Sequence, residues 1–237
     1  MRALLLAAGF GTRLRPLTNT IPKCLVPVKG QPLMAYWFDL LFQAGLERVL
    51  VNTHYLPEAV RNFVSQSPWA RKVDLVYEAS ILGTGGTVLA NAAWFQAKPF
   101  LVAHADNLTA FDVNEFVDRH LNRPHGCVIT MMTFDTDAPH NCGIVEELDG
   151  VVVAFHEKVV NPPSSRANAA VYIFEPEVIT FMTALTKSVL DLSTEVLPHF
   201  LGRMCTYHNR HYHRDIGNLE SLALAEQEFV NVRFMNI

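Results

Sequence analysis

The sequence predicts an α/β fold: a Rossmann-like sheet, mixed but mainly parallel, with helices on both faces and a β-rich insertion. Two features lead to this expectation. Through about the first 135 residues, short apolar runs typical of buried strands alternate with segments of helical periodicity. Beyond them, strand-like runs follow one another, and Asp149-Gly150 between two of these runs is typical of a hairpin turn. Half of the 237 residues are hydrophobic, which is enough for the core of one α/β unit.

The individual elements follow from the same patterns. Strands are expected over residues 3–8, 47–52, 72–77, 99–103, 126–133, 143–147, 151–156, 170–174 and 206–212. Helices are expected over residues 32–44, 57–65, 85–95, 113–122, 177–185, 194–201 and 219–229. The first helix has apolar residues at helical spacing and ends before Gly45, and Pro57 suits the first turn of the second. Because the first five strands alternate with helices, a parallel sheet covered on both faces is predicted.

The composition excludes several classes of protein. The net charge is −4 and 18% of residues are charged, which argues against disorder and against a nucleic-acid or membrane-surface partner. The apolar stretches fall far short of the ~20 residues of a membrane span, and residues 3–8 are too few for a signal-peptide core. The cysteines, Cys24, Cys127, Cys142 and Cys205, form no C-x-x-C pair, so we expect free thiols. We therefore expect a cytoplasmic enzyme.

The first 27 residues contain the clearest indication of chemistry. An apolar run ends at Gly9, and Gly11, Thr12, Arg13 and Lys23 follow. Glycines let backbone N–H groups approach an anion, and Arg and Lys supply charge, so this stretch suits a phosphate. It matches neither G-x-G-x-x-G nor a Walker A loop. Taken alone, it is also compatible with a tight turn beside solvated cations.

The ends of the predicted strands indicate where a ligand would lie. Open α/β sheets bind ligands beyond the carboxyl ends of their strands, so residues 9–13, 78–86 and 104–107 should line one mouth. Asp106 ends an apolar strand at this edge, where an acid would otherwise be poorly placed. Taken singly, Asp106 also suits a helix cap, and Asp215 suits the start of a turn.

The opening stretch also resembles a known family. L-A-A-G-F-G-T-R-L-R-P-L-T at residues 6–18 and P-K-C-L-V-P-V at residues 22–28 resemble the signature of the sugar-1-phosphate nucleotidylyltransferases. The similarity extends to Asp215-Ile216-Gly217, and the chain resembles the short form without a C-terminal β-helix. The resemblance implies the nucleotide-diphospho-sugar transferase fold in one domain over residues 1–237. Its nucleotide half would run to about residue 135 and its sugar-phosphate half from about residue 136.

The resemblance also implies a reaction and a site. A sugar-1-phosphate oxygen would attack the α-phosphorus of an NTP, and pyrophosphate would leave, which requires positioning and charge neutralisation rather than a covalent nucleophile. The implied catalytic residues are Arg13, Lys23, Asp106 and Asp215. The implied nucleotide-binding residues are Ala8, Gly9, Gly11, Thr12, Glu78 and Gly83. In that family the Arg grips pyrophosphate, the Lys neutralises the phosphates, and the two Asp bind Mg²⁺, the one cofactor expected.

On the sugar side, the resemblance implies a separate group of residues. They are Gly143, Glu157, Lys158 and Asn168. Glu157 would meet sugar hydroxyls and Lys158 the sugar phosphate. The chain departs from the family at Cys142, Ala170 and His213, where an aromatic residue, a Gly and a Trp are usual. The first two departures lie on the sugar side and leave the sugar's identity open.

Several alternatives stay open. Residues 82–86, L-G-T-G-G, resemble guanylyltransferases acting on mannose 1-phosphate or heptose 1-phosphate, which favours GTP over UTP or TTP. A cytidylyltransferase for a phosphorylated alcohol such as phosphocholine would share the opening motif, and a non-catalytic binding module would share the fold. His208, His211 and His213 permit a zinc site, although polar lining of a sugar pocket or surface positions suit them better. The expected partners are the NTP and the sugar 1-phosphate, and no oligomeric state is predicted.

Overall fold

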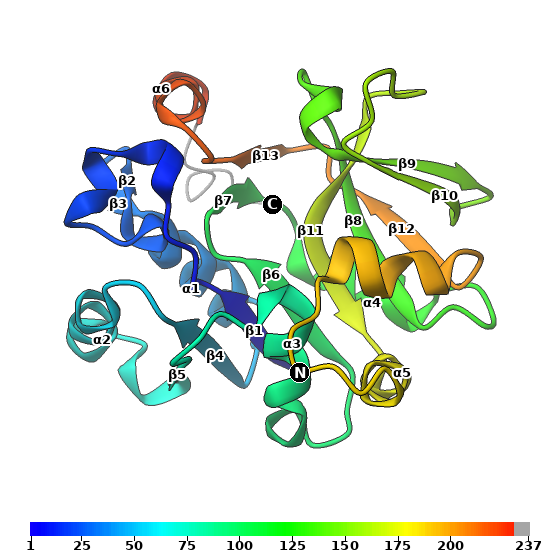
Figure 1. The fold of residues 1–237 in the computed structure, drawn as a ribbon, viewed down its shortest axis with the longest axis horizontal. Helices are drawn as coiled ribbons and strands as arrows, with labels where there is room; N and C mark the ends of the chain where they lie inside the picture. The colour runs from blue at the N-terminus through cyan, green and yellow to red at the C-terminus, as the bar shows by residue number, and fades with distance from the viewer. Residues whose placement is uncertain (230–237) are drawn as a thin grey trace.

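The computed structural model describes residues 1–229. These residues form one nine-stranded sheet and the helices that pack on it (Figure 1). The strands lie in the order β5-β4-β1-β6-β11-β8-β12-β10-β9. They are β1 (Arg2–Leu6), β4 (Arg48–Thr53), β5 (Val73–Tyr77), β6 (Phe100–His104), β8 (Ile129–Asp135), β9 (Gly143–Leu148), β10 (Val151–Glu157), β11 (Arg166–Phe174) and β12 (Met204–His208). The helices are α1 (Leu33–Gln43), α2 (Pro57–Gln66), α3 (Gly83–Ala90), α4 (Val113–Leu121), α5 (Pro176–Ala184) and α6 (Leu219–Glu228). None of these helices is long and apolar enough to cross a membrane.

The predicted mixed α/β class is confirmed, and the structure adds the order of the strands, which the sequence did not predict. Strands β5, β4, β1 and β6 are parallel neighbours, as the alternation with helices predicts. The fifth predicted strand, β8, does not lie next to β6. Instead β11 returns from the second half of the chain, pairs antiparallel with β6 and also pairs with β8. A strand from the second half of the chain therefore lies between β6 and β8, the fourth and fifth of the predicted strands.

Two hydrophobic cores cover the two faces of the sheet. Along β1, Ala3 and Leu5 belong to the core beneath α1, α2 and α4, whereas Leu4 belongs to the core beneath α3 and α5. This alternation follows from the two-residue period of a strand, which points successive side chains to opposite faces. The two cores hold the strands that end at the ligand-binding edge.

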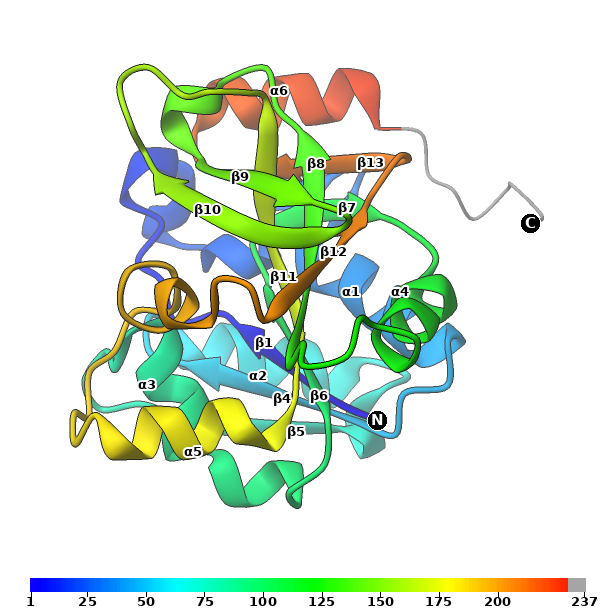
Figure 2. The same cartoon turned by 90° about the vertical axis from the view of Figure 1, so that its right-hand side faces the viewer.

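A third, smaller core lies where the beginning and the end of the described chain meet. Its buried members are Leu14, Val26, Val28, Leu33, Tyr36, Leu108, Ala110, Ile216, Ala225 and Phe229. It packs beneath two short sheets, β2 (Pro27–Val28) with β3 (Gln31–Pro32), and β7 (Asn107–Ala110) with β13 (Tyr212–Asp215). Figure 2 shows β13 and α6 together on one side of the main sheet. This core fixes the position of the opening loop relative to the C-terminal motif.

Three of the expected elements are wrong in detail. The helix expected over residues 85–95 is α3, Gly83–Ala90, followed by a 3-10 turn, Ala92–Phe95. The strand expected over residues 206–212 is two strands, β12 and β13, because the Asn209 side chain bonds Thr109 and the Tyr212 carbonyl and redirects the chain between them. The helix expected over residues 194–201 is a π turn, Leu192–Val196, followed by a 3-10 turn, Leu197–Phe200. Pro198 lacks the N–H that an α-helix would need there. All four cysteines are free thiols, as expected, and three of them are buried.

Candidate active site

The first cavity lies at the carboxyl ends of β1, β4 and β6 and has a volume of about 200 Å³. Its lining residues are Leu6, Ala8, Gly9, Asn52, Glu78, Ile81, Gly83, Thr84, Thr87, His104 and Asp106. The three segments expected to share one mouth all contribute to this lining, so that prediction is confirmed. From β1 the chain proceeds to β4 and β5 on one side and then to β6 on the other. Such a switch point is where open α/β sheets bind their ligands.

A buried polar network forms part of the wall of this cavity. Asn52 donates from Nδ2 to Glu78 Oε1 at 3.0 Å and accepts from the Ala7 amide at 2.7 Å. The Thr87 hydroxyl donates to the same Glu78 oxygen at 2.6 Å. The second oxygen of Glu78, Oε2, is buried and has no hydrogen-bond partner within residues 1–229. An unpaired buried carboxyl oxygen is costly, so this atom is suited to accept a hydrogen bond from a ligand.

Asp106 and Asp215 come together although they are far apart in the sequence. Strand β13 pairs antiparallel with β7, and the register places Asp215 opposite Asn107, next to Asp106. The Ile216 amide donates to the Asp106 carbonyl at 3.2 Å. The Lys23 ammonium pairs with Asp106 and lies 3.2 Å from Asp215 Oδ1. Three of the four predicted catalytic residues therefore form one group, which we call the Lys23 cluster (Lys23, Asp106 and Asp215).

Burial and charge act against each other in the Lys23 cluster. Burial opposes the charge on Lys23, but Asp106 and Asp215 outweigh it, so the pKa of Lys23 lies above its ordinary value. Burial likewise opposes the charge on Asp106, yet Lys23 and then His104 hold the pKa of Asp106 below its usual range. Lys23 and Asp106 are therefore charged at neutral pH.

The two carboxylates fit the ligand chemistry of a divalent cation. The Lys23 ammonium already contacts both Asp106 and Asp215, which shows that their oxygens are close enough to share one cation. Mg²⁺ is typically bound by one or two carboxylates together with substrate phosphates and water. Within residues 1–229 no three His, Cys, Asp or Glu side chains gather as a metal site, so phosphate and water would complete the coordination shell.

Arg13, the fourth predicted catalytic residue, is exposed and approaches the Lys23 cluster from the 3-10 turn Thr12–Leu14. It has no ion-pair partner in the described part of the chain. Gly217 provides the space beside it, because a Cβ there would come within 2.8 Å of Asp215 Oδ2 and 3.1 Å of Arg13 Nη2. An unpaired guanidinium at this position is available for a phosphate.

Gly11 and Thr12 lie outside the lining of the first cavity, although the sequence placed them with the nucleotide. In the structure, Gly11 instead allows a tight turn of the backbone. Its φ of 63° is in the left-handed region, and a Cβ there would press on Thr18 and on Lys23 at 3.2 Å. The glycine therefore lets the opening loop turn close to Lys23.

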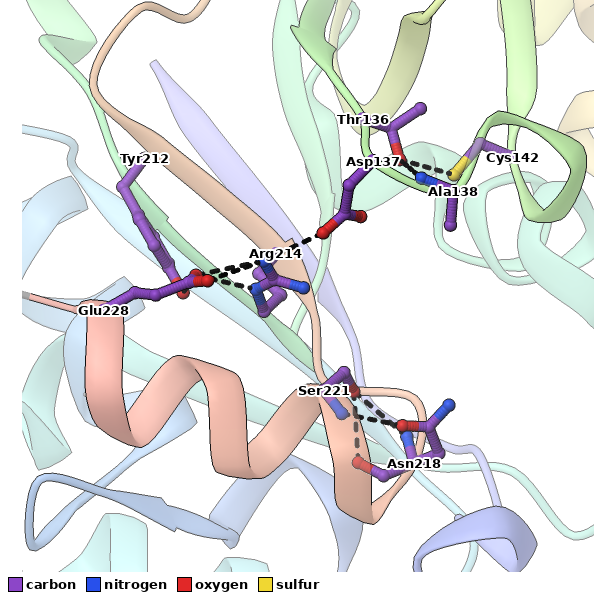
Figure 3. A network of polar contacts seen from close by, with 9 residues as sticks. All are labelled: Thr136, Asp137, Ala138, Cys142, Tyr212, Arg214, Asn218, Ser221 and Glu228. Carbon is purple, nitrogen blue, oxygen red and sulfur yellow. Dashed lines mark hydrogen bonds and ion pairs between the residues drawn. The ribbon is translucent and has the colours of Figure 1, made fainter.

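A second cleft, of about 490 Å³, adjoins the cluster at Asp215. Its lining residues are Arg13, Phe134, Asp135, Thr136, Asp137, Ala138, Asn141, Cys142, Lys158, His213, Arg214, Asp215, Gly217, Asn218 and Ser221. Figure 3 shows part of these walls, with Arg214 between Asp137 and the helix that begins after Asn218. Because Asp106 lines the first cavity and Asp215 the second, the Lys23 cluster lies where the two meet.

The residues predicted for the sugar side lie around this second cleft, but only Lys158 lines it. Glu157 ends β10, and its Oε1 is 3.3 Å from the Lys158 ammonium. A Cβ on Gly143 would lie 2.6 Å from Phe155 Cζ and 2.7 Å from Glu157 Oε2, so a glycine lets both side chains keep their places. The Gly143–Glu157–Lys158 group is thus one structural unit.

Asn168 lies in β11 and is engaged within the protein. Its Nδ2 donates to the Tyr172 hydroxyl at 2.7 Å, and its Oδ1 accepts from the Ala170 amide at 3.0 Å. Ala170 has a φ of 53°, the left-handed region that favours glycine, which accounts for the glycine usual at this place in the family.

The sequence alone did not identify two polar residues of the first cavity, Asn52 and Thr87. Asn52 had a usable indication, since it is a polar residue at the carboxyl end of an apolar strand. The histidines near the C-terminus form no zinc site within residues 1–229. His208 lies 3.5 Å from Asp135, and His213 packs on Phe134 with ring centroids 4.3 Å apart. Burial lowers the pKa of His213 to about 3, so it is neutral.

Comparison with known proteins agrees with this geometry. The family model described as nucleotidyl transferase matches residues 2–231. The chain belongs to this nucleotidyl transferase family. A mannose-1-phosphate guanylyltransferase of Mycobacterium tuberculosis is 29% identical over 233 residues, which cover 96% of this chain and 64% of the relative. A UTP–glucose-1-phosphate uridylyltransferase of Synechocystis is 30% identical over 213 residues, covering 84% and 54%.

The nucleotidyl transferase fold also appears among solved structures. HddC from Yersinia pseudotuberculosis, complexed with GMP-PN, superposes with a TM-score of 0.81 at 24% identity, covering 97% of this chain and 99% of that one. By contrast, the chain spans between about half and two thirds of the length of the curated relatives it matches.

Proposed function

We propose that this nucleotidyl transferase moves a nucleotidyl group from an NTP to a sugar 1-phosphate and releases pyrophosphate. The observation that carries the proposal is the position of the Lys23 cluster. Asp106 faces a cavity of nucleotide-binding type, Asp215 faces a second polar cleft, and Lys23 contacts both acids. A transfer between two ligands needs its charged groups at the boundary between the two binding sites.

The chemistry would be an in-line displacement. An oxygen of the sugar phosphate forms a bond to the α-phosphorus, the bond from that phosphorus to the bridging oxygen breaks, and pyrophosphate takes the electron pair. Lys23 supplies a fixed positive charge beside the reacting phosphate, and Arg13 is free to hold the leaving pyrophosphate. Bound between Asp106 and Asp215, Mg²⁺ would neutralise phosphate charge as it develops.

The base we propose is guanine. Glu78 presents a buried carboxyl oxygen with no partner in the described chain. Guanine offers two adjacent donors on its Watson–Crick edge, N1–H and N2–H, whereas uracil and thymine offer one N–H between two carbonyl oxygens. A buried acceptor rewards the donor-rich edge and penalises carbonyl oxygens. The name of the Mycobacterium tuberculosis relative supports this choice, while that of the Synechocystis relative keeps UTP as the second candidate.

A pyrophosphate-release assay across the NTPs and across sugar 1-phosphates tests the reaction, the base and the metal together. We expect turnover with GTP, its loss on treatment with EDTA, and its return with Mg²⁺. Glu78→Gln keeps the oxygen that Asn52 and Thr87 bond but replaces the free one by a donor. It should lower kcat/KM for GTP by about 10–100-fold.

The exposed Glu47→Gln change, in an ion pair with Arg2, serves as the matched control and should leave kcat/KM unchanged. Turnover with UTP but not GTP, insensitive to Glu78→Gln, would reject guanine and leave the transfer reaction standing. Absence of pyrophosphate release with every pair, in folded wild-type protein, would reject the transfer itself.

A further inference from the structure

The second cleft has one wall in which the family resemblance marks only position 142, where an aromatic residue is usual, and assigns no role to the residues before it. This wall is the segment between β8 and β9, residues 136–142, and it faces Asp215 across the cleft. The segment is held in shape by its own bonds. The Ala138 amide donates to Thr136 Oγ1 at 3.1 Å, and the Thr136 hydroxyl lies 3.7 Å from Cys142 Sγ. The wall is therefore an ordered surface with defined side-chain positions.

Two side chains of this wall have hydrogen-bonding capacity to spare. The Asp137 side chain is 69% exposed, and only its Oδ2 is engaged, at 3.4 Å from Arg214. The Asn141 side chain makes no hydrogen bond within residues 1–229. A carboxylate and a primary amide that line the same wall of a cleft can accept from and donate to the hydroxyl groups of a ligand. That is the chemistry that recognises a sugar ring.

Arg214 connects this wall to the opposite side of the cleft. Its side chain is 17% exposed, and its guanidinium is 3.0 Å from Glu228 at the end of α6 and 3.4 Å from Asp137 (Figure 3). Burial opposes its charge, but Tyr212 and Glu228 keep the pKa of Arg214 above its ordinary value. A planar guanidinium presents five donors in a rigid fork, so it can hold two carboxylates in fixed directions.

We propose that Asp137 and Asn141, in the 136–142 wall, form hydrogen bonds with the hydroxyl groups of the acceptor sugar. Arg214 is the positioning residue that holds this wall in place relative to Asp215. The inference rests on the proposed function, since it names the part of the cleft that selects the sugar. Acceptor selection then depends on residues outside the Gly143–Glu157–Lys158 group. Lys158 would bind the sugar phosphate, and the 136–142 wall would bind the ring.

Steady-state kinetics on Arg214→Lys and Asn141→Ala test the proposal. Both should raise KM for the sugar 1-phosphate about tenfold, with KM for the NTP within about twofold of wild type. Arg48→Lys is the matched control, because Arg48 also makes a forked pair, with Asp74, at a distant edge of the sheet. It should leave both KM values unchanged. Asp137→Asn should alter the ranking of sugar 1-phosphates without altering the ranking of NTPs.

Hydrogen exchange gives a second measurement that needs no turnover. Mannose 1-phosphate and glucose 1-phosphate are added separately to wild-type protein and to Arg214→Lys, and exchange is followed over residues 136–142. We expect protection in the wild type and less protection in the variant. Protection of residues 136–142 without any turnover would support this inference while rejecting the proposed reaction.

Two results would overturn the inference. One is wild-type turnover with an acceptor KM that Arg214→Lys and Asn141→Ala change no more than Arg48→Lys does. The other is protection by sugar phosphates that leaves residues 136–142 unaffected. If neither sugar phosphate protects any segment and no pair turns over, the reaction and the inference both fail.

Discussion

At the scale of single residues, two positions favour glycine because a carboxylate oxygen lies close to each of them. A Cβ at Gly217 would meet Asp215 Oδ2 at 2.8 Å, and a Cβ at Gly143 would meet Glu157 Oε2 at 2.7 Å. Contacts shorter than 3.0 Å force a neighbour to move. Asp215 belongs to the Lys23 cluster and Glu157 to the sugar side. The two glycines therefore preserve the geometry of different parts of the site.

Alanine substitutions at these glycines should separate the two parts. Gly217→Ala should lower kcat about 100-fold, because it displaces Asp215 and Arg13 from the reacting phosphate. Gly143→Ala should mainly raise KM for the sugar 1-phosphate, because it displaces Glu157. Steady-state kinetics with each substrate varied in turn provide the measurement. Equal effects of both changes on the same kinetic constant would contradict this division.

Residue types in motifs could be predicted, but several of their partners could not. The motifs placed Asp106, Asp215 and Lys23 in one site, and the structure brings these three together. The Asn52–Glu78 bond depends on the register of β4 against β5, which pairs Asn52 with Val76. No spacing in a single sequence encodes that register. Arg214 was not identified for a similar reason, since its partners come from a loop and from the end of a distant helix.

At the scale of elements, α4 is joined to the sheet by a buried histidine. His120 is fully buried, with Nδ1 at 2.8 Å from the Thr130 hydroxyl of β8 and Nε2 at 3.3 Å from Glu175. Burial, with some effect of Arg123, lowers the pKa of His120 from 6.5 to about 4. His120 is therefore neutral in the folded protein at neutral pH, and its contact with Glu175 is a hydrogen bond rather than an ion pair.

This histidine should make stability depend on pH in a defined direction. Above pH 6.5, His120 is neutral in both states and the full free energy of unfolding is present. Between pH 6.5 and about 4 the unfolded chain binds a proton that the folded chain does not, so the free energy of unfolding falls. A shift of this size corresponds to a loss on the order of 3 kcal/mol.

His120→Asn should reduce that loss, and urea unfolding at pH 7 and pH 5 measures it. His125→Asn, at an exposed position, controls for the removal of one histidine. If the variant at position 120 loses as much stability between the two pH values as the control does, His120 is not the source of the pH dependence.

Element types were easier to predict than element partners. The helices and early strands follow hydrophobic periodicity, which is a local property of the chain. The pairing of β11 with β6 and of β13 with β7 joins segments that are far apart in the sequence, and only the fold determines it. Strand β7, Asn107–Ala110, was not predicted from the sequence. Its four residues are too few to show a pattern of alternating apolar and polar side chains.

At the scale of the whole molecule, the two main cores support the sheet and the third core supports the site. Leu14 of the third core follows Arg13, and Ile216 follows Asp215. Apolar packing in this small cluster therefore sets the distance between the opening loop and the C-terminal acid. Stability and activity are expected to depend on different cores.

Two leucine truncations test this expectation. Leu14 and Leu41 are both completely buried, Leu14 in the third core and Leu41, a residue of α1, in a main core. Each Leu→Ala change should lower the free energy of unfolding by about 2–5 kcal/mol. Only Leu14→Ala should also lower kcat markedly in protein shown to be folded, because it loosens Arg13. A similar loss of kcat in Leu41→Ala would show that the third core has no special relation to the site.

The third core joins segments that are far apart in the sequence. It therefore also determines when, during synthesis, this part of the protein can finish folding. Its N-terminal members, from Leu14 to Tyr36, are covered by Ile216, Ala225 and Phe229. Contacts between such distant segments close late, since the intervening chain must be ordered first. Until residues 216–229 have been made, this core has only Leu108 and Ala110 to add to its N-terminal members. We therefore expect nucleotide binding to appear only after residue 229 has left the ribosome, and a stalled-chain series assayed for nucleotide binding would show the length at which it begins.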